Sequence, residues 1–188
     1  MSGSGHDEKQ AALRLRALAH PLRWTLLDLV AREGTATATR CSEVTGESVA
    51  SCSYHLNILG KYGYLEVVQG AGRDKPWRSA GLCQDLAAPG RDVEAELASE
   101  AATEAFLEHE FARVRAWRRR LGTEPAEWRK AVGLGGATMW VSAEELDQVT
   151  KELMAVLHRY TERSEDPALR PAGARESRVF FFAAVSPR

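Results

Sequence analysis

Ser48-Val-Ala-Ser-Cys-Ser-Tyr-His-Leu56 and Gly72-Arg-Asp-Lys-Pro-Trp-Arg78 bound the part of this 188-residue chain that decides its fold. The first stretch opens on a serine, a residue type that commonly caps the N-terminus of a helix. On a helical wheel, one side of this stretch carries Val49, Cys52, Leu56 and Leu59. The other side carries Ala50, Ser51, Tyr54, Asn57 and Lys61. The stretch therefore predicts an amphipathic helix with one core face and one small, polar face.

The flanking sequence predicts a second helix and a hairpin. A polar segment from Thr39 to Thr45, followed by Gly46, indicates a short helix and a tight turn before Ser48. Gly60 and Gly63 are expected to end the longer helix. The strand-forming run 64–68 and a second run that begins near Trp77 predict a β-hairpin. This order of parts is that of a helix-turn-helix followed by a wing.

A helix-turn-helix holds its second helix in the major groove of DNA, where small residues allow close approach and Ser, Tyr and Asn can bond bases or phosphates. An ordinary amphipathic surface helix is the alternative explanation of the wheel. Leu18-Ala-His-Pro-Leu-Arg23, Ser53-Tyr-His-Leu56 and Gly63-Tyr-Leu65 resemble the signature of ArsR-type winged helix-turn-helix bacterial transcriptional regulators, over residues of about 13–80. The resemblance implies a homodimeric repressor that binds an inverted-repeat operator in double-stranded DNA.

The same resemblance implies DNA contacts from two elements. In the recognition helix they are Ser48, Ser51, Ser53, Tyr54 and Asn57, and in the wing they are Arg73, Lys75 and Arg78. The wheel adds Lys61 on the polar face. His55 leans toward the core side, so we expect it to be a packed, hydrogen-bonded side chain.

The charge distribution argues both for and against DNA binding. The net charge is −1 and the sequence pI about 6.5, which is less basic than many nucleic-acid binders. Of 25 Lys and Arg and 26 Asp and Glu, residues 1–80 hold ten and eight, which leaves fifteen and eighteen for residues 81–188. The acidity thus lies in the C-terminal half. A winged-helix protein-interaction module without specific DNA binding is therefore the main alternative function.

Enzyme, metal and cofactor functions are not expected. Cys41, Cys52 and Cys83 are odd in number and widely spaced, without the clustered thiolates that soft metals need. Gly133-Leu-Gly-Gly136 lacks the following helix of a cofactor-binding loop, and no nucleophile and base pair is recognisable. No apolar run approaches the ~20 residues that span a bilayer, and the N-terminus lacks the apolar middle of a signal peptide. These patterns indicate a cytoplasmic protein with no membrane partner.

The rest of the chain predicts supporting helices and an extension. Helices are expected over about residues 8–18, from Pro21 to Gly34, and over residues 92–121 through Val93, Leu97, Ala101, Leu107, Phe111, Val114, Trp117 and Leu121. Ser142-Ala-Glu-Glu145 is a capping box that begins another helix, and strands are expected over residues 137–141 and 178–185. We therefore predict a mostly helical α+β protein: a winged helix-turn-helix domain (1–82) and a C-terminal domain (91–188) with a long helix and a small α+β unit.

The C-terminal region resembles extensions of some actinobacterial winged-helix regulators. Its role leaves three alternatives open, because its aromatic residues could form a filled core, a dimer interface or the pocket of a small-molecule effector. The residues concerned are Trp117, Met139, Trp140, Phe180, Phe181 and Phe182.

Overall fold

The fold is mostly helical with one small antiparallel sheet, as the sequence predicts. The computed structural model describes residues 4–68, 75–81, 86 and 93–185. Its helices and strands are α1 (Ser4–Arg16), α2 (Pro21–Glu33), α3 (Ala38–Thr45), α4 (Val49–Lys61), β1 (Leu65–Val67), β2 (Trp77–Ser79), α5 (Val93–Arg120), η1 (Leu121–Thr123), α6 (Ala126–Ala131), α7 (Ala143–His158), α8 (Glu162–Glu165) and η2 (Pro167–Leu169). No helix in this described part of the chain is long and apolar enough to cross a membrane.

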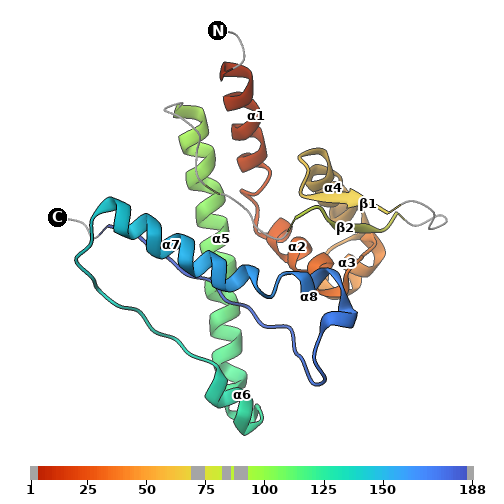
Figure 1. Cartoon of the computed structure of the whole chain (residues 1–188). Helices are drawn as coiled ribbons and strands as arrows, with labels where there is room; N and C mark the ends of the chain where they lie inside the picture. The colour runs from red at the N-terminus through yellow and green to blue at the C-terminus, as the bar shows by residue number, and fades with distance from the viewer. Residues whose placement is uncertain (1–3, 69–74, 82–85, 87–92, 186–188) are drawn as a thin grey trace. The chain divides into compact units, whose positions relative to one another are not determined.

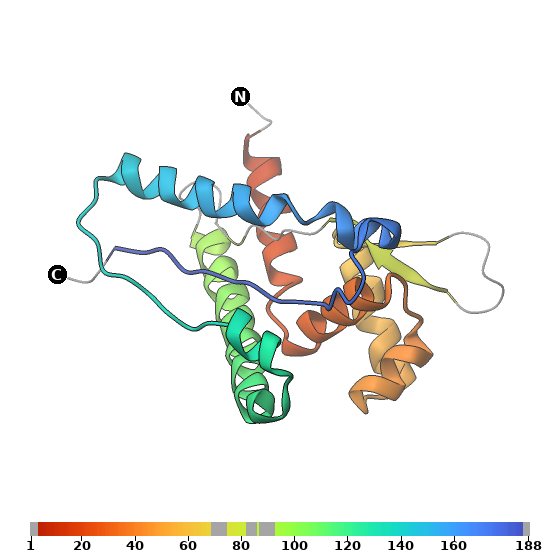
Figure 2. The same ribbon diagram turned by 60° about the horizontal axis from the view of Figure 1, so that its bottom comes forward.

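The chain divides into two compact units, Met1–Glu124 and Pro125–Arg188. Helix α5 belongs to the first unit because it packs along α1 and against α2 (Figures 1 and 2). The sequence predicts this helix as part of the C-terminal domain (91–188). Spatial contacts instead group it with the helices that precede the hairpin.

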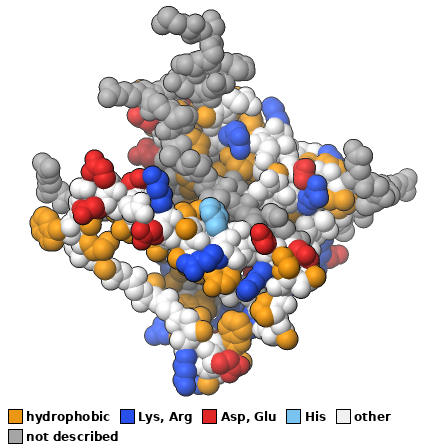
Figure 3. Space-filling view, in the orientation of Figure 1, with side chains coloured by type: hydrophobic (Ala, Val, Ile, Leu, Met, Phe, Trp, Pro, Cys, Tyr) orange, Lys and Arg blue, Asp and Glu red, His pale blue; other side chains and the backbone are white. Residues whose placement is uncertain are grey.

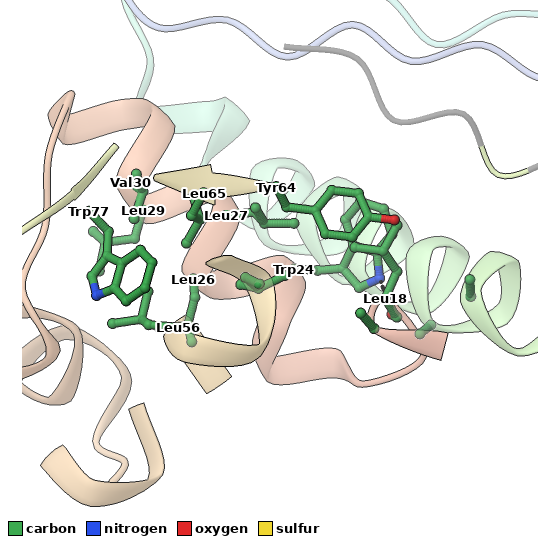
Figure 4. Close-up of a cluster of buried hydrophobic side chains, with 14 of the residues drawn as sticks. Leu18, Trp24, Leu26, Leu27, Leu29, Val30, Leu56, Tyr64, Leu65 and Trp77 are labelled. Atoms are coloured by element: carbon green, nitrogen blue, oxygen red, sulfur yellow. Dashed lines mark hydrogen bonds between the residues drawn. The ribbon is translucent and has the colours of Figure 1, made fainter. Parts of the chain in front are cut away.

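The core of the first unit is built from the buried faces of α2 and α4, closed by the sheet (Figure 4). Leu26 and Leu56 are fully buried, and Leu65 and Trp77 cover them from β1 and β2. Trp24 adds a hydrogen bond from its Nε1 to the backbone oxygen of Leu18, at 2.9 Å. Full burial of each large apolar side chain stabilises the fold by about 1.5–3 kcal/mol. This core therefore fixes α4 and the hairpin on one scaffold.

The hairpin is anchored to the start of α3 as well as paired with itself. β1 and β2 pair antiparallel, with Glu66 opposite Arg78 and Val67 opposite Trp77. Trp77 also forms an isolated antiparallel bridge with Ala36, whose two backbone hydrogen bonds measure 2.9 and 3.0 Å. The sheet edge next to α3 is thereby covered, and the position of the hairpin is tied to the segment that begins α3.

Gly60 does not end α4, contrary to the prediction from the sequence. The helix continues to Lys61, and the chain reverses at Gly63, whose φ is +77°. Gly60 is a packing position: a Cβ there would lie 2.2 Å from Cζ3 of the Trp77 ring. The absence of a side chain lets the indole rest directly on the helix backbone.

Helix α5 buries a different stripe from the one predicted. Ala95, Ala98, Ala102 and Ala105 are buried, whereas Val93 and Leu97 are 68% and 60% exposed. Small side chains let two helices approach closely, so the alanine stripe faces α1 while the larger residues face outward. On the same helix His109 Nε2 lies 2.6 Å from Asp28 Oδ2, and the Arg113 guanidinium donates to the same oxygen. These bonds join α5 to α2.

In its described residues, 125–185, the second unit has helices and irregular segments but no strand, so the prediction of a small α+β unit there is wrong. The capping box of α7 is confirmed: Ser142 Oγ accepts from the Glu145 backbone nitrogen and the Ser142 nitrogen donates to Glu145 Oε2. The predicted strands at 137–141 and 178–185 do not form. A strand requires a neighbouring backbone to pair with, and the structure pairs neither segment with one.

The aromatic residues of the second unit do not form a filled core. Trp140 is fully exposed, Phe182 is 79% exposed and Met139 is 52% exposed. Figure 3 shows hydrophobic side chains on the molecular surface. These exposed side chains are therefore available to a second copy of the chain or to a small molecule.

Candidate nucleic-acid interface

A short, well-capped turn holds α3 and α4 in place. The Thr37 hydroxyl accepts from the Arg40 nitrogen at the start of α3, and Gly46 ends that helix in the left-handed region. Ser48 Oγ then accepts from the Ser51 nitrogen at 3.1 Å and begins α4, as predicted. Between them Ser42 Oγ donates to the Glu47 backbone oxygen at 2.6 Å. These bonds leave the turn little freedom, so the direction of α4 follows from that of α3.

Helix α4 has one buried side and one solvent-exposed side, largely as the helical wheel predicts. Cys52, His55, Leu56 and Leu59 are buried against the core. His55 is confirmed as a packed side chain that accepts a hydrogen bond from Arg23. Val49 is an exception, because it is 46% exposed at the first turn of the helix instead of lying in the core. The buried residues leave the opposite side of α4 open to solvent.

We call the predicted DNA-contacting residues that the structure describes the polar face. Tyr54, Asn57 and Lys61 are exposed on α4, Ser51 and Ser53 are half-buried beside them, and Ser48 lies at the N-terminus with its hydroxyl engaged as the cap. Lys75 and Arg78 are exposed on and beside β2. Arg73 lies outside the described residues. The polar face is therefore composed of Ser48, Ser51, Ser53, Tyr54, Asn57, Lys61, Lys75 and Arg78.

One bond joins the hairpin to α4 within the polar face. Lys75 Nζ donates to Asn57 Oδ1 at 3.1 Å and lies 4.5 Å from the centre of the Trp77 ring. Asn57 in turn donates through Nδ2 to the Ser53 backbone oxygen at 2.7 Å. The Asn57 side chain is thus engaged at both ends. The sequence does not predict the bond between Asn57 and Lys75, because it depends on tertiary packing.

A second pair reduces the positive charge of the hairpin. Arg78 Nε lies 2.8 Å from Glu66 Oε1, directly across the β1–β2 ladder. Both side chains are at least half exposed, and such surface pairs contribute little and exchange readily. The described polar face thus has a modest positive charge, from Lys61, Lys75 and a partly neutralised Arg78.

The buried thiols offer little chemistry. Cys41 and Cys52 are free and buried between α3 and α4, and burial raises the pKa of the Cys41 thiol to about 11. A thiol with that pKa stays protonated near neutral pH and is a poor nucleophile or metal ligand. Among the described residues no group of three or more His, Cys, Asp or Glu side chains could hold a metal ion, and Cys83 lies outside them.

The chain matches no known protein-family model and no curated protein. A function for this chain is therefore inferred from the arrangement of α3, α4 and the hairpin and from the chemistry of the side chains that they expose.

Proposed function

We propose that this protein is a sequence-specific transcriptional regulator that binds double-stranded DNA through a winged helix-turn-helix of α3, α4 and the β1–β2 wing. One observation carries the proposal. Helix α4 is rigidly capped, buries one face in the core and exposes Ser51, Tyr54 and Asn57 beside a hairpin that bears Lys75 and Arg78. This arrangement supports the proposal, because side chains of these types can bond base edges and neighbouring cations can contact phosphates.

The dimensions of α4 support insertion into the major groove. An α-helix with its side chains is about 10–12 Å wide and the groove is about 12 Å wide, so only small residues allow deep entry. Ala50 and Ser51 supply small side chains in the first turn, and Tyr54, 61% exposed, reaches outward one turn later. The polar face therefore suits close approach to base edges.

A homodimer suits this interface because two copies related by a two-fold axis would present two α4 helices to an inverted repeat. Exposed apolar residues on α5, Leu97 at 60% and Phe111 at 47%, support burial by a second copy. A cytoplasmic dimer seated on a promoter would act as a repressor by excluding polymerase. A small-molecule effector would alter the affinity for operator DNA, and a thermal-shift screen would detect it as a compound that stabilises the protein.

A protein-interaction module is the second candidate. The observation that favours it is the pairing of Arg78 with Glu66 together with a net charge of −1, which limits attraction to phosphates. A module of this kind would use the same polar face to bind a partner protein and would have no operator.

Fluorescence anisotropy with DNA flanking the protein's own gene separates the two functions. We expect preferential binding over unrelated DNA, with an affinity that falls steeply with salt. Tyr54→Ala and Asn57→Ala should each weaken the specific complex by about tenfold or more. Tyr160→Ala, which removes another exposed tyrosine from the second unit, is the matched control. Equal, weak binding of both DNAs, unchanged by the α4 variants, would favour the interaction module.

A further inference from the structure

Arg23 in the first turn of α2 bonds to two other helical segments. Its Nη1 donates to the backbone oxygens of Arg16 and Ala17, at 3.2 and 2.9 Å, where α1 ends. Its Nε donates to Nδ1 of His55 in α4, at 3.1 Å. The last carbonyls of a helix lack partners within the helix, so a cation there is favourable. Arg23 thus connects the end of α1 to the middle of α4.

His55 is held on several sides. The His20 ring at the start of α2 lies 4.4 Å away between centroids, and the Tyr54 ring lies 5.1 Å away, edge-on. His20 is itself fixed, because its Nδ1 accepts from the Leu22 nitrogen as the cap of α2. His55 is 7% exposed. The orientation of the His55 ring is therefore fixed by its neighbours, and a change in that orientation would also change the rotation of α4.

The bond from Arg23 requires a neutral His55. Nδ1 of His55 accepts the hydrogen bond from Arg23 Nε only while Nδ1 carries no proton, and a protonated imidazole donates from both nitrogens. The guanidinium stays charged at all physiological pH values. Protonation of His55 would therefore remove the acceptor and place two cations in contact.

We propose that Arg23 and neutral His55 are positioning residues of the DNA-binding surface, which fix the rotation of α4 against α1 and α2, so that specific DNA binding is lost when His55 takes up a proton. This inference rests on the proposed DNA-binding function. Tyr54 and Asn57, which belong to the polar face, flank His55 in the sequence. A rotation of α4 would move them both relative to the hairpin.

The direction of the pH dependence follows from the groups around His55. Burial, then His20 and Arg23, lower the pKa of His55, and Glu47 from the turn before α4 opposes them. A lowered pKa in the folded state means that the arrangement is stable above about pH 6.5, the ordinary histidine pKa, and is weakened as the pH falls below it. Any gain of positive charge as the pH falls strengthens non-specific attraction to DNA. The ratio of specific to non-specific affinity therefore isolates the positioning effect.

Full-length variants at position 55 test the proposal. The probe is the duplex that the wild-type protein enriches from a random library of about 30 base pairs, with unrelated duplex as the reference. We expect the wild-type ratio to fall about tenfold between about pH 7.5 and pH 5.5. His55→Asn keeps an acceptor that does not titrate and should hold the ratio constant. His55→Leu has no acceptor and should show the low ratio at every pH.

His20→Asn is the matched control, because Asn also caps helices and leaves His55 free to titrate. It should keep a pH-dependent ratio. A pH dependence that persists in His55→Asn would overturn the proposal, as would a His55→Leu protein that behaves as wild type. If His55→Leu fails to fold, the comparison of wild type with His55→Asn still shows whether the pH dependence comes from His55.

A measurement without DNA separates this inference from the proposed function. The His55 imidazole is titrated by ¹⁵N NMR while the Tyr54 ring and Asn57 amide signals are followed. We expect both signals to shift with the midpoint of His55, and to lose this dependence in Arg23→Met. Signals that ignore the His55 midpoint would refute positioning even if the protein binds an operator. Signals that follow it in a protein without an operator would refute the DNA-binding function and retain the Arg23–His55 coupling.

Discussion

Replacement of Gly60 by alanine tests how the hairpin is seated on α4. The added Cβ would lie 2.2 Å from Cζ3 and 2.6 Å from Cη2 of Trp77, where carbon atoms normally stay about 3.5–4 Å apart. The indole cannot move freely, because the Trp77 backbone is paired with β1 on one side and hydrogen-bonded to Ala36 on the other. Helix and ring must therefore separate by roughly an ångström or more.

The cost follows from two opposing effects. Overpacking of a filled site costs about 1–3 kcal/mol, and alanine gains about 1 kcal/mol over glycine in a helix interior. We therefore expect Gly60→Ala to lower the free energy of unfolding of the first unit by up to about 2 kcal/mol. Urea titration followed through the amide NMR signals of α4 measures this quantity without a contribution from the second unit.

Two further variants make the test specific. Gly122→Ala, at a glycine with open space around it, should change stability by about 0.5 kcal/mol or less. Trp77→Leu removes the atoms that clash, so Gly60→Ala added to that variant should be neutral or stabilising by about 1 kcal/mol. Close packing of Trp77 on Gly60 would be contradicted by a Gly60→Ala protein at least as stable as wild type, or by an effect that is the same with and without the Trp77 ring.

Two other predictions follow from ion pairs in the first unit. Asp28→Asn removes the charged acceptor of His109 and Arg113, so the thermal midpoint of the first unit should fall and its free energy of unfolding should drop by about 1–2 kcal/mol. The control is Asp147→Asn, which breaks the exposed pair with Lys151 in α7 and should cost about 0.5 kcal/mol or less. Equal effects would contradict a role for Asp28 in joining α2 to α5. Glu66→Gln frees Arg78 for phosphate, so the slope of log affinity against log salt should steepen by about 1, whereas Arg78→Gln should make it shallower. An unchanged slope in both variants would place Arg78 away from DNA.

Local signals in the sequence were sufficient for most of the helices and for the hairpin. Ser48 and the Ser142–Glu145 box predict helix starts that the structure confirms, because a cap is formed by residues only three positions apart. The buried face of α4 also follows from spacing alone at Cys52, Leu56 and Leu59. The candidate site on α4 could therefore be located from the sequence, although its DNA-binding role stays a prediction.

Tertiary packing decided the features that depend on residues far apart in the chain. Gly60 could not be distinguished from a helix breaker until the Trp77 ring was seen to rest on it, and the alanine stripe of α5 was hidden by larger apolar residues that face outward. Isolated apolar runs at 137–141 and 178–185 predicted strands, but the structure pairs neither run with another strand. The bonds from Lys75 to Asn57 and from Arg23 to His55 span 18 and 32 residues. Pattern and propensity report what a segment prefers locally, whereas these interactions depend on which segments the fold brings together.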